Sequence, residues 1–146
     1  MRAVLQRVSE ASVSVGDEVV GEINQGLMVL FCAEEGDTNQ QAEYFAKKIA
    51  KMRIFSDENG KLNLSVADIG GSVLVVSQFT LAADWKKGNR PGFSGAAKPE
   101  EGKRLYELFI KLLRQEHDLK VETGIFAANM QVSLTNDGPI TIPMEG

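Results

Sequence analysis

Apolar and polar residues alternate over much of the first third of the chain, which is the pattern of half-buried β-strands. Three such segments are separated by short polar stretches, with a Gly16-Asp17-Glu18 turn before the last of them. A continuously apolar segment then follows the turn at 24–26. We therefore predict an antiparallel meander with strands at residues 2–8, 11–15, 19–23 and 27–33.

A second apolar run, Val73-Leu74-Val75-Val76, lies between a pair of glycines and the polar Ser77-Gln78. A short run of this kind is typical of a strand that is buried on both faces. We predict a central strand over residues 72–79. Its exit is a rigid support on which functional groups could be mounted.

Two stretches have the 3.6-residue period of amphipathic helices. The first, 38–52, opens with Thr38 and Gln41 in the spacing of a capping box. The second, 99–117, opens with Pro99, which suits a first helical turn. The apolar positions are Ala42, Phe45, Ala46, Ile49 and Met52 in the first and Leu105, Leu108, Phe109, Leu112 and Leu113 in the second.

The remaining segments complete a domain in which strands predominate. Asn59-Gly60 predicts a hairpin between 53–55 and 62–64. Later strands are expected at 119–122, 126–134 and 140–144, with a turn at Asn136-Asp137-Gly138-Pro139. We predict one α+β domain over residues 1–146, with mostly antiparallel strands curled into a sheet or partial barrel and two helices covering one face.

Composition narrows the classes of protein. The net charge of −4 argues against binding nucleic acid through the whole surface, although a local basic patch is compatible with it. The single cysteine, Cys32, excludes an internal disulfide, and its place in an apolar run favours a buried side chain. No apolar run reaches the ~20 residues needed to span a bilayer. We expect a soluble, cytoplasmic protein that does not contact a membrane.

Few side chains suit acid–base or metal chemistry. The sole histidine, His117, falls at a polar helix end, and with one Cys and one His we expect no metal and no cofactor. Hydroxyls and backbone amides remain. Ser77 and Thr80 could present an Oγ, and the N–H groups of residues 79–81 could bind an oxyanion. The alternative, which the pattern alone favours, is that the two hydroxyls only satisfy backbone groups at a strand end.

The basic loop, the residues Phe126 and Met130, and the Gly138-Pro139 pair each have two interpretations. Residues 82–98 have no period and carry Lys86, Lys87 and Arg90 among glycines and two aromatics, so they either bind phosphate or form a solvated loop. Phe126 and Met130 lie on the inward face of their predicted strand and are core residues by default. Gly138-Pro139 is by default an ordinary turn, since only about 5–6% of X-Pro bonds in folded proteins are cis.

Read together, these segments resemble the D-aminoacyl-tRNA deacylase family nearly end to end. The resemblance rests above all on Ser77-Gln78-Phe79-Thr80-Leu81 and Asn136-Asp137-Gly138-Pro139-Ile140-Thr141 at their separation in the chain, with neither motif departing from the family pattern. Further matching segments are 2–8, 89–93 and 124–130.

The resemblance implies hydrolysis of the ester between a D-amino acid and the 3′-terminal adenosine of tRNA, and of glycine mischarged on alanine tRNA. It implies a homodimer in which Gly138 and a cis Pro139 of one subunit enter the other subunit's site and exclude L side chains. The adenosine would lie against Phe126 and Met130.

The family resemblance also implies roles near the ester. Ser77, Gln78, Phe79 and Thr80 would surround it, and Arg7 would tether the Gly-Pro loop. Contacts with the acceptor stem would come from Lys86, Lys87 and Arg90.

Thr80 is one candidate nucleophile on this interpretation, and the 2′-hydroxyl of the terminal ribose is the other. The scarcity of basic side chains favours the second. The alternative functions are a non-catalytic binder of tRNA 3′ ends and a hydrolase of small D-aminoacyl esters.

Overall fold

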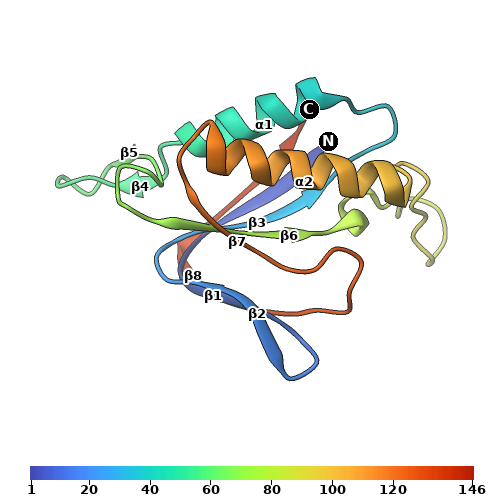
Figure 1. The fold of residues 1–146 in the computed structure, drawn as a ribbon, viewed down its shortest axis with the longest axis horizontal. Helices are drawn as coiled ribbons and strands as arrows, with labels where there is room; N and C mark the ends of the chain where they lie inside the picture. The colour runs from blue at the N-terminus through green and yellow to red at the C-terminus, as the bar shows by residue number, and fades with distance from the viewer.

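A curled six-stranded sheet with two α-helices on one face makes up the fold, which a computed structural model describes for all residues from Met1 to Gly146 (Figure 1). A two-stranded ribbon lies beside it. In chain order the elements are β1 (Arg2–Val15), β2 (Glu18–Ile23), β3 (Gly26–Cys32), α1 (Asn39–Lys51), β4 (Phe55–Ser56), β5 (Leu62–Leu64), β6 (Ser72–Ser77), the 3₁₀ turn η1 (Phe79–Ala82), α2 (Pro99–Gln115), β7 (Lys120–Thr123) and β8 (Gln131–Glu145).

The strand order in the main sheet is β2-β1-β3-β6-β7, and β8 also pairs with β1. β1 is antiparallel to β2, β3 and β8, which confirms the mostly antiparallel prediction. The pairs β3–β6 and β6–β7 are parallel, and these were not predicted. Each of these two pairs is joined through one of the helices, and a helical crossover returns the chain in the same direction.

The two ends of the sheet approach each other and produce the predicted partial barrel. Gly21 of β2 lies against β7 so closely that an added Cβ would stand 2.7 Å from the carbonyl oxygen of Thr123. Only glycine permits this approach. The sheet is therefore curled nearly closed, with α1 and α2 packed side by side on its outer face (Figure 1).

Two apolar clusters bury the two faces of the central strand. Val73 and Val75 belong to a cluster of 25 buried residues that includes the apolar faces of both helices. Leu74 and Val76 belong to a second cluster of 7 residues on the other face of the sheet. The prediction of a strand buried on both faces is confirmed, and β6 is held rigidly up to Ser77.

The helices begin where the sequence predicts. Thr38 caps α1 with a complete capping box to Gln41, and Pro99 occupies the first turn of α2 with Glu100 and Glu101 beside it. The α1 prediction is one residue too long at each end, and α2 ends at Gln115 rather than at residue 117. The ribbon β4–β5 confirms the predicted hairpin.

Three strand predictions need correction. The segments 2–8 and 11–15 are one strand, β1, because β8 pairs with both parts through two register shifts. The central strand ends at Ser77 and not at residue 79, because the chain enters η1. Residues 126–130 are not a strand: Ala127 has φ 65° and the N–H of Ala128 donates to Ile125, so the chain turns there.

The predicted turn at residues 136–139 is also different. Asn136 pairs with Val8, and Thr141 pairs with Gln6, so the chain on both sides of the Gly-Pro pair follows β1 in the same direction. There is no final hairpin. Gly138 and Pro139 instead bulge out of β8 between two parts that share one partner strand.

Candidate active site

The exit of β6 presents two free backbone donors. The N–H of Gln78 donates to the carbonyl of Phe31 (2.7 Å), which fixes the chain as it leaves the sheet. The first hydrogen bond of η1 comes from the N–H of Leu81 to Gln78 (3.2 Å). The N–H groups of Phe79 and Thr80 therefore have no partner inside the turn. Of the three predicted oxyanion donors, Leu81 is used internally, and two are available.

The side chains of this turn are held from within it. The Gln78 amide Nε2 donates to the Thr80 hydroxyl. A group that donates to an oxygen cannot remove its proton, so Gln78 does not act as a base toward Thr80 in this arrangement. Phe79 is 59% exposed, and its ring packs edge-on against Phe93 with 5.1 Å between ring centroids.

Cys32 lies behind this turn, on the protein side. Its thiol donates to the carbonyls of Ala33 (3.3 Å) and Phe79 (3.6 Å). Burial raises the pKa of the Cys32 thiol above its ordinary value. A buried, protonated thiol supports the turn by packing, which agrees with the interpretation from sequence.

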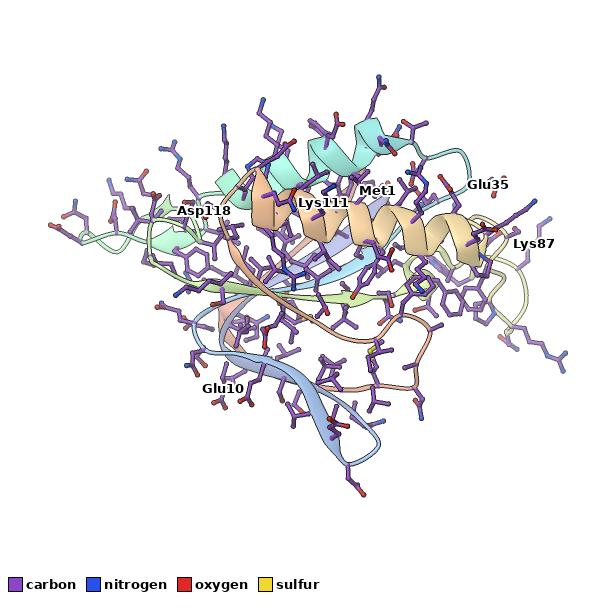
Figure 2. All side chains as sticks on the ribbon, viewed as in Figure 1. Met1, Glu10, Glu35, Lys87, Lys111 and Asp118 are labelled. Atoms are coloured by element: carbon purple, nitrogen blue, oxygen red, sulfur yellow. The ribbon has the colours of Figure 1, made fainter.

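The basic loop after η1 is ordered by its own backbone. Asp84 and Gly92 exchange two backbone hydrogen bonds, of 2.8 and 2.9 Å, and the N–H of Ala97 donates to Ala33 (3.0 Å). Lys86, Lys87 and Arg90 are all exposed at the tip. Figure 2 shows Lys87 projecting into solvent beyond the first turn of α2. None of these three cations forms an ion pair within the protein.

Phe126 and Met130 are half-buried residues of the segment between β7 and β8, and not of a strand. Phe126 packs against Tyr106 of α2, with ring centroids 5.7 Å apart. Met130 packs against the smaller apolar cluster, which contains Val76. The two side chains therefore pack against different apolar clusters.

Gly138 and Pro139 are joined by a cis peptide bond, as the resemblance implied. Arg7 of β1 holds the bulge, because its Nε donates to the carbonyl of Asp137 (2.8 Å) and its Nη1 donates to the carbonyl of Ile54 (3.0 Å). Asn136 closes the base of the bulge: its Oδ1 accepts from the N–H of Ile140 (2.7 Å) and its Nδ2 donates to Thr141 Oγ1 (2.9 Å).

The bulge and the β6 exit do not meet within one chain. Phe31 of β3 pairs with Ala3 of β1 on one side and with Ser77 of β6 on the other, so Ser77 lies at the height of Ala3 in the sheet. The bulge lies further along β1, between the residues of β8 that pair with Gln6 and Val8. By strand geometry this is about 13 Å along the strands and about 14 Å across three strand spacings. The residues that the sequence assigns to one site thus form two separate groups.

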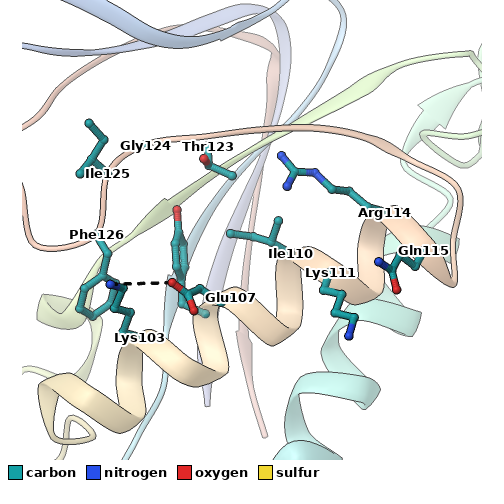
Figure 3. Close-up of a pocket in the computed structure, with 11 residues that line it drawn as sticks. Lys103, Glu107, Ile110, Lys111, Arg114, Gln115, Thr123, Gly124, Ile125 and Phe126 are labelled. Atoms are coloured by element: carbon teal, nitrogen blue, oxygen red, sulfur yellow. Dashed lines mark ion pairs between the residues drawn. The ribbon is translucent and has the colours of Figure 1, made fainter.

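A groove of about 480 Å³ lies between α2 and the segment that follows β7 (Figure 3). Tyr106 at its floor donates its hydroxyl to the carbonyl of Val75 (3.2 Å), and the N–H of Gly124 donates to the same oxygen (3.1 Å). Burial raises the pKa of Tyr106 to about 12, so the phenol is neutral at physiological pH. Two residues that line the groove are therefore hydrogen-bonded to Val75, two residues before the end of β6.

Sequence reasoning missed two residues of these surroundings. Tyr106 falls outside the apolar stripe of α2, and nothing in the sequence places its hydroxyl on β6. Asparagine is common in turns, so Asn136 was assigned to one. Asn136 and Thr141 flank the Gly-Pro pair five residues apart, and this spacing is the one sequence feature that indicates the hydrogen bond between them.

No helix is long and apolar enough to cross a membrane. No group of three or more His, Cys, Asp or Glu side chains is arranged to hold a metal ion.

The fold defines a class of small α+β proteins with a nearly closed mixed sheet and two helices on its outer face. The family model for D-Tyr-tRNA(Tyr) deacylase matches residues 4–145. A D-aminoacyl-tRNA deacylase of Dinoroseobacter shibae is 58% identical over the whole of both chains, and one of Ruegeria pomeroyi is 59% identical over 99% of each. The chain therefore belongs to the D-aminoacyl-tRNA deacylase family, and it is a hydrolase.

Two solved structures share the fold. One, a "c-Myc DNA Unwinding Element Binding Protein", superposes with a TM-score of 0.93 and 42% identity over 100% of this chain and 99% of the other. The second, described as "a probable eukaryotic D-amino acid tRNA deacylase", has a TM-score of 0.82 at 18% identity over 98% of this chain and 97% of the other. The second match supports the fold alone.

Proposed function

We propose that this protein hydrolyses the ester bond of D-aminoacyl-tRNA and releases the free D-amino acid and tRNA. The observation that carries the proposal is the match over the full chain to relatives that bear this name. The site agrees with it in chemistry, because two free backbone N–H groups at the β6 exit suit an ester whose carbonyl oxygen becomes negative during hydrolysis.

The ester would lie against Ser77, Gln78, Phe79 and Thr80, with the developing oxyanion facing the N–H groups of Phe79 and Thr80. Phe126 and Met130 would contact the terminal adenosine, since aromatic and apolar side chains accept a base face without reading its sequence. Lys86, Lys87 and Arg90 would meet phosphates of the acceptor stem, and binding through them is sensitive to salt.

Selectivity for D-residues and glycine would come from Gly138 and Pro139 of a second subunit. Within one chain these residues are far from the β6 exit, and the bulge that carries them is held in place by Arg7 and Asn136. In a homodimer their carbonyl oxygens would stand close to the substrate α-carbon. An L side chain would then collide with them, whereas a D side chain or a hydrogen would not.

The catalytic step would use the 2′-hydroxyl of the terminal ribose to assist attack. Thr80 receives a hydrogen bond from Gln78 and has no base beside it, so its oxygen is not activated. In this mechanism the protein only positions the ester and stabilises the oxyanion.

The primary experiment compares D-tyrosyl-tRNA with L-tyrosyl-tRNA, and glycyl-tRNA(Ala) with alanyl-tRNA(Ala). We expect release of D-tyrosine and glycine and survival of both L esters. Binding without loss of any ester would favour a non-catalytic binder of tRNA 3′ ends. Hydrolysis of small D-aminoacyl esters with no preference for tRNA would favour the third candidate, a small-ester hydrolase.

The cross-subunit arrangement has its own experiment. Light scattering at the assay concentration should give twice the mass of one chain. A monomer that still discriminates D- from L-tyrosyl-tRNA would contradict the role of the partner's bulge. We expect this activity in the cytoplasm, where tRNA is charged, with residues 1–146 acting as one domain.

A further inference from the structure

From the groove beside α2 we infer a binding site for the single-stranded nucleotides that precede the terminal adenosine of the tRNA. The inference rests on the proposed function, because it extends the contact of Phe126 with the adenosine. It concerns residues of α2 that neither family motif contains.

The charge of the groove is opposite to that of the whole protein. Lys103, Lys111 and Arg114 line it with a single carboxylate, Glu107, which gives a local charge of +2 on a chain whose net charge is −4. The floor residue Tyr106 is neutral at physiological pH. A positive strip on a negative protein favours a polyanion that follows the strip over any general attraction to the surface.

These cations are available to a ligand. Lys103 and Glu107 are 3.9 Å apart on the exposed face of α2, a separation at which an ion pair contributes little. Arg114 uses one guanidinium nitrogen for the carbonyl of Val121 (2.7 Å), which orients the rest of the group over the groove (Figure 3). Lys111 lies on the rim with no ion pair.

The shape of the groove fits a short single strand. Lys103 and Arg114 are eleven residues apart on one helix, which is about 16 Å. The opposite wall is Thr123 to Phe126, in which Ile125 is 48% exposed and Phe126 stands at the Lys103 end (Figure 3). A cationic track with an apolar or aromatic platform is the usual surface for single-stranded nucleic acid.

The groove is also continuous with the ester site. Tyr106 and Gly124 both donate to the carbonyl of Val75, so the floor of the groove and the end of β6 are one hydrogen-bonded unit. A strand whose last base rests on Phe126 would therefore place its ester toward Ser77 and its preceding phosphates along α2. The exposed cations of the 86–90 loop lie beyond the first turn of α2, at the end of the groove opposite to Arg114, so they take no part in the groove site.

The experiment uses the double variant Lys103→Gln with Lys111→Gln, and as matched control Lys47→Gln with Lys61→Gln, which removes the same charge from exposed positions on α1 and the β4–β5 ribbon. A fluorescent single-stranded RNA ending in CCA serves as the binding probe, and D-tyrosyl-tRNA as the substrate. We expect the groove variant to weaken RNA binding about tenfold and to raise KM with little change in kcat. The salt dependence of its RNA binding should also become shallower, by about 1.4 in the log–log slope, because each neutralised phosphate of a single strand accounts for about 0.7. The control should match the wild type.

Glu107→Gln supplies a test of the opposite sign, because it removes the only carboxylate of the groove and should tighten RNA binding. Groove variants that bind RNA like the control, or an unchanged Kd in Glu107→Gln, would overturn the inference. A fall in kcat with unchanged RNA binding would also overturn it. If the wild type leaves D-tyrosyl-tRNA intact, the proposed function fails instead, and the RNA-binding comparison still decides whether the groove binds single strands.

Discussion

Arg7 Nε donates to the main-chain carbonyl of Asp137 over 2.8 Å, which ties the middle of β1 to the residue just before Gly138. The same guanidinium reaches the carbonyl of Ile54, so one planar group joins β1, the bulge of β8 and the residue that precedes β4. The Arg7 side chain is only 12% exposed, and a charged donor in such a place contributes more than a surface ion pair does.

The first prediction is that Arg7→Lys impairs deacylation. A lysine keeps the charge but lacks the planar fork that reaches two carbonyls at once. Each hydrogen bond removed from a charged donor costs about 1.5–3 kcal/mol. We expect kcat/KM for D-tyrosyl-tRNA to fall at least about tenfold, since about 1.36 kcal/mol in the barrier is a factor of ten.

The matched control for Arg7 is Arg53→Lys, at an exposed position close to the same region. Circular dichroism should show that both variants fold. Equal kinetics in the two variants would remove Arg7 from the site.

The second prediction concerns Gly138, whose φ is +148°. A Cβ at this position would stand 2.9 Å from the backbone nitrogen of Ile140 and 3.4 Å from Arg7. Gly138→Ala should therefore displace the bulge, lower kcat/KM for D-tyrosyl-tRNA, and cost about 1–3 kcal/mol in the free energy of unfolding, measured with urea.

Gly16→Ala is the control for Gly138→Ala, because Gly16 also has a positive φ but has no atom within 4 Å of an added Cβ. This variant should lose some stability and keep full activity. A Gly138→Ala protein that deacylates at the wild-type rate would show that the bulge does not contribute to the site.

The third prediction is a dependence of stability on pH that Glu34 causes. Burial alone would raise the pKa of Glu34, but hydrogen bonds from the Met1 α-ammonium and Arg2 outweigh it and hold the pKa below its ordinary value. A lowered folded-state pKa stabilises the protein above the unfolded-state pKa, and this stabilisation is lost as pH falls through the folded-state pKa.

The free energy of unfolding should therefore decrease as the pH falls below the ordinary glutamate range, and Glu34→Gln should be less stable at pH 7 with a flatter profile. The neighbouring exposed Glu35→Gln is the control. Parallel pH profiles for the wild type and Glu34→Gln would contradict the assignment.

The predictions from sequence succeeded where burial leaves a periodic signal. Val73 to Val76 are buried on alternate faces against two clusters, so an unbroken apolar run identified the central strand. The capping residues Thr38 and Pro99 act locally, and they placed the helix starts within one residue. Parallel pairing of β3 with β6 leaves no local signal, because it depends on where a helix returns the chain.

One failure shows that alternation does not require a strand. In a strand Phe126 and Met130 would share one face, but the chain turns at Ala127 and the two side chains pack against different apolar clusters. Gly138-Pro139 has the composition of a turn, but β1 pairs on both sides of it. The sequence indicated the exit of the central strand, at Ser77 to Thr80, as a candidate site, whereas the link of β6 to α2 through Tyr106 and Val75 depends on tertiary packing alone.

The last prediction separates the two candidate mechanisms at Thr80. Its hydroxyl accepts a hydrogen bond from Gln78, and no base stands beside it, so removing that hydroxyl should cost little. The N–H of residue 80 remains in an alanine variant and can still face the oxyanion. We therefore expect Thr80→Ala to retain at least about a tenth of the wild-type kcat. A D-tyrosyl-tRNA that ends in 2′-deoxyadenosine should be hydrolysed at least about a hundredfold more slowly, the loss expected when an assisting group is removed.

A folded Thr80→Ala protein that binds tRNA but has no activity would instead make Thr80 the nucleophile. Full hydrolysis of the 2′-deoxy substrate would exclude the ribose hydroxyl, and single-turnover kinetics on both substrates distinguishes these outcomes because it isolates the chemical step.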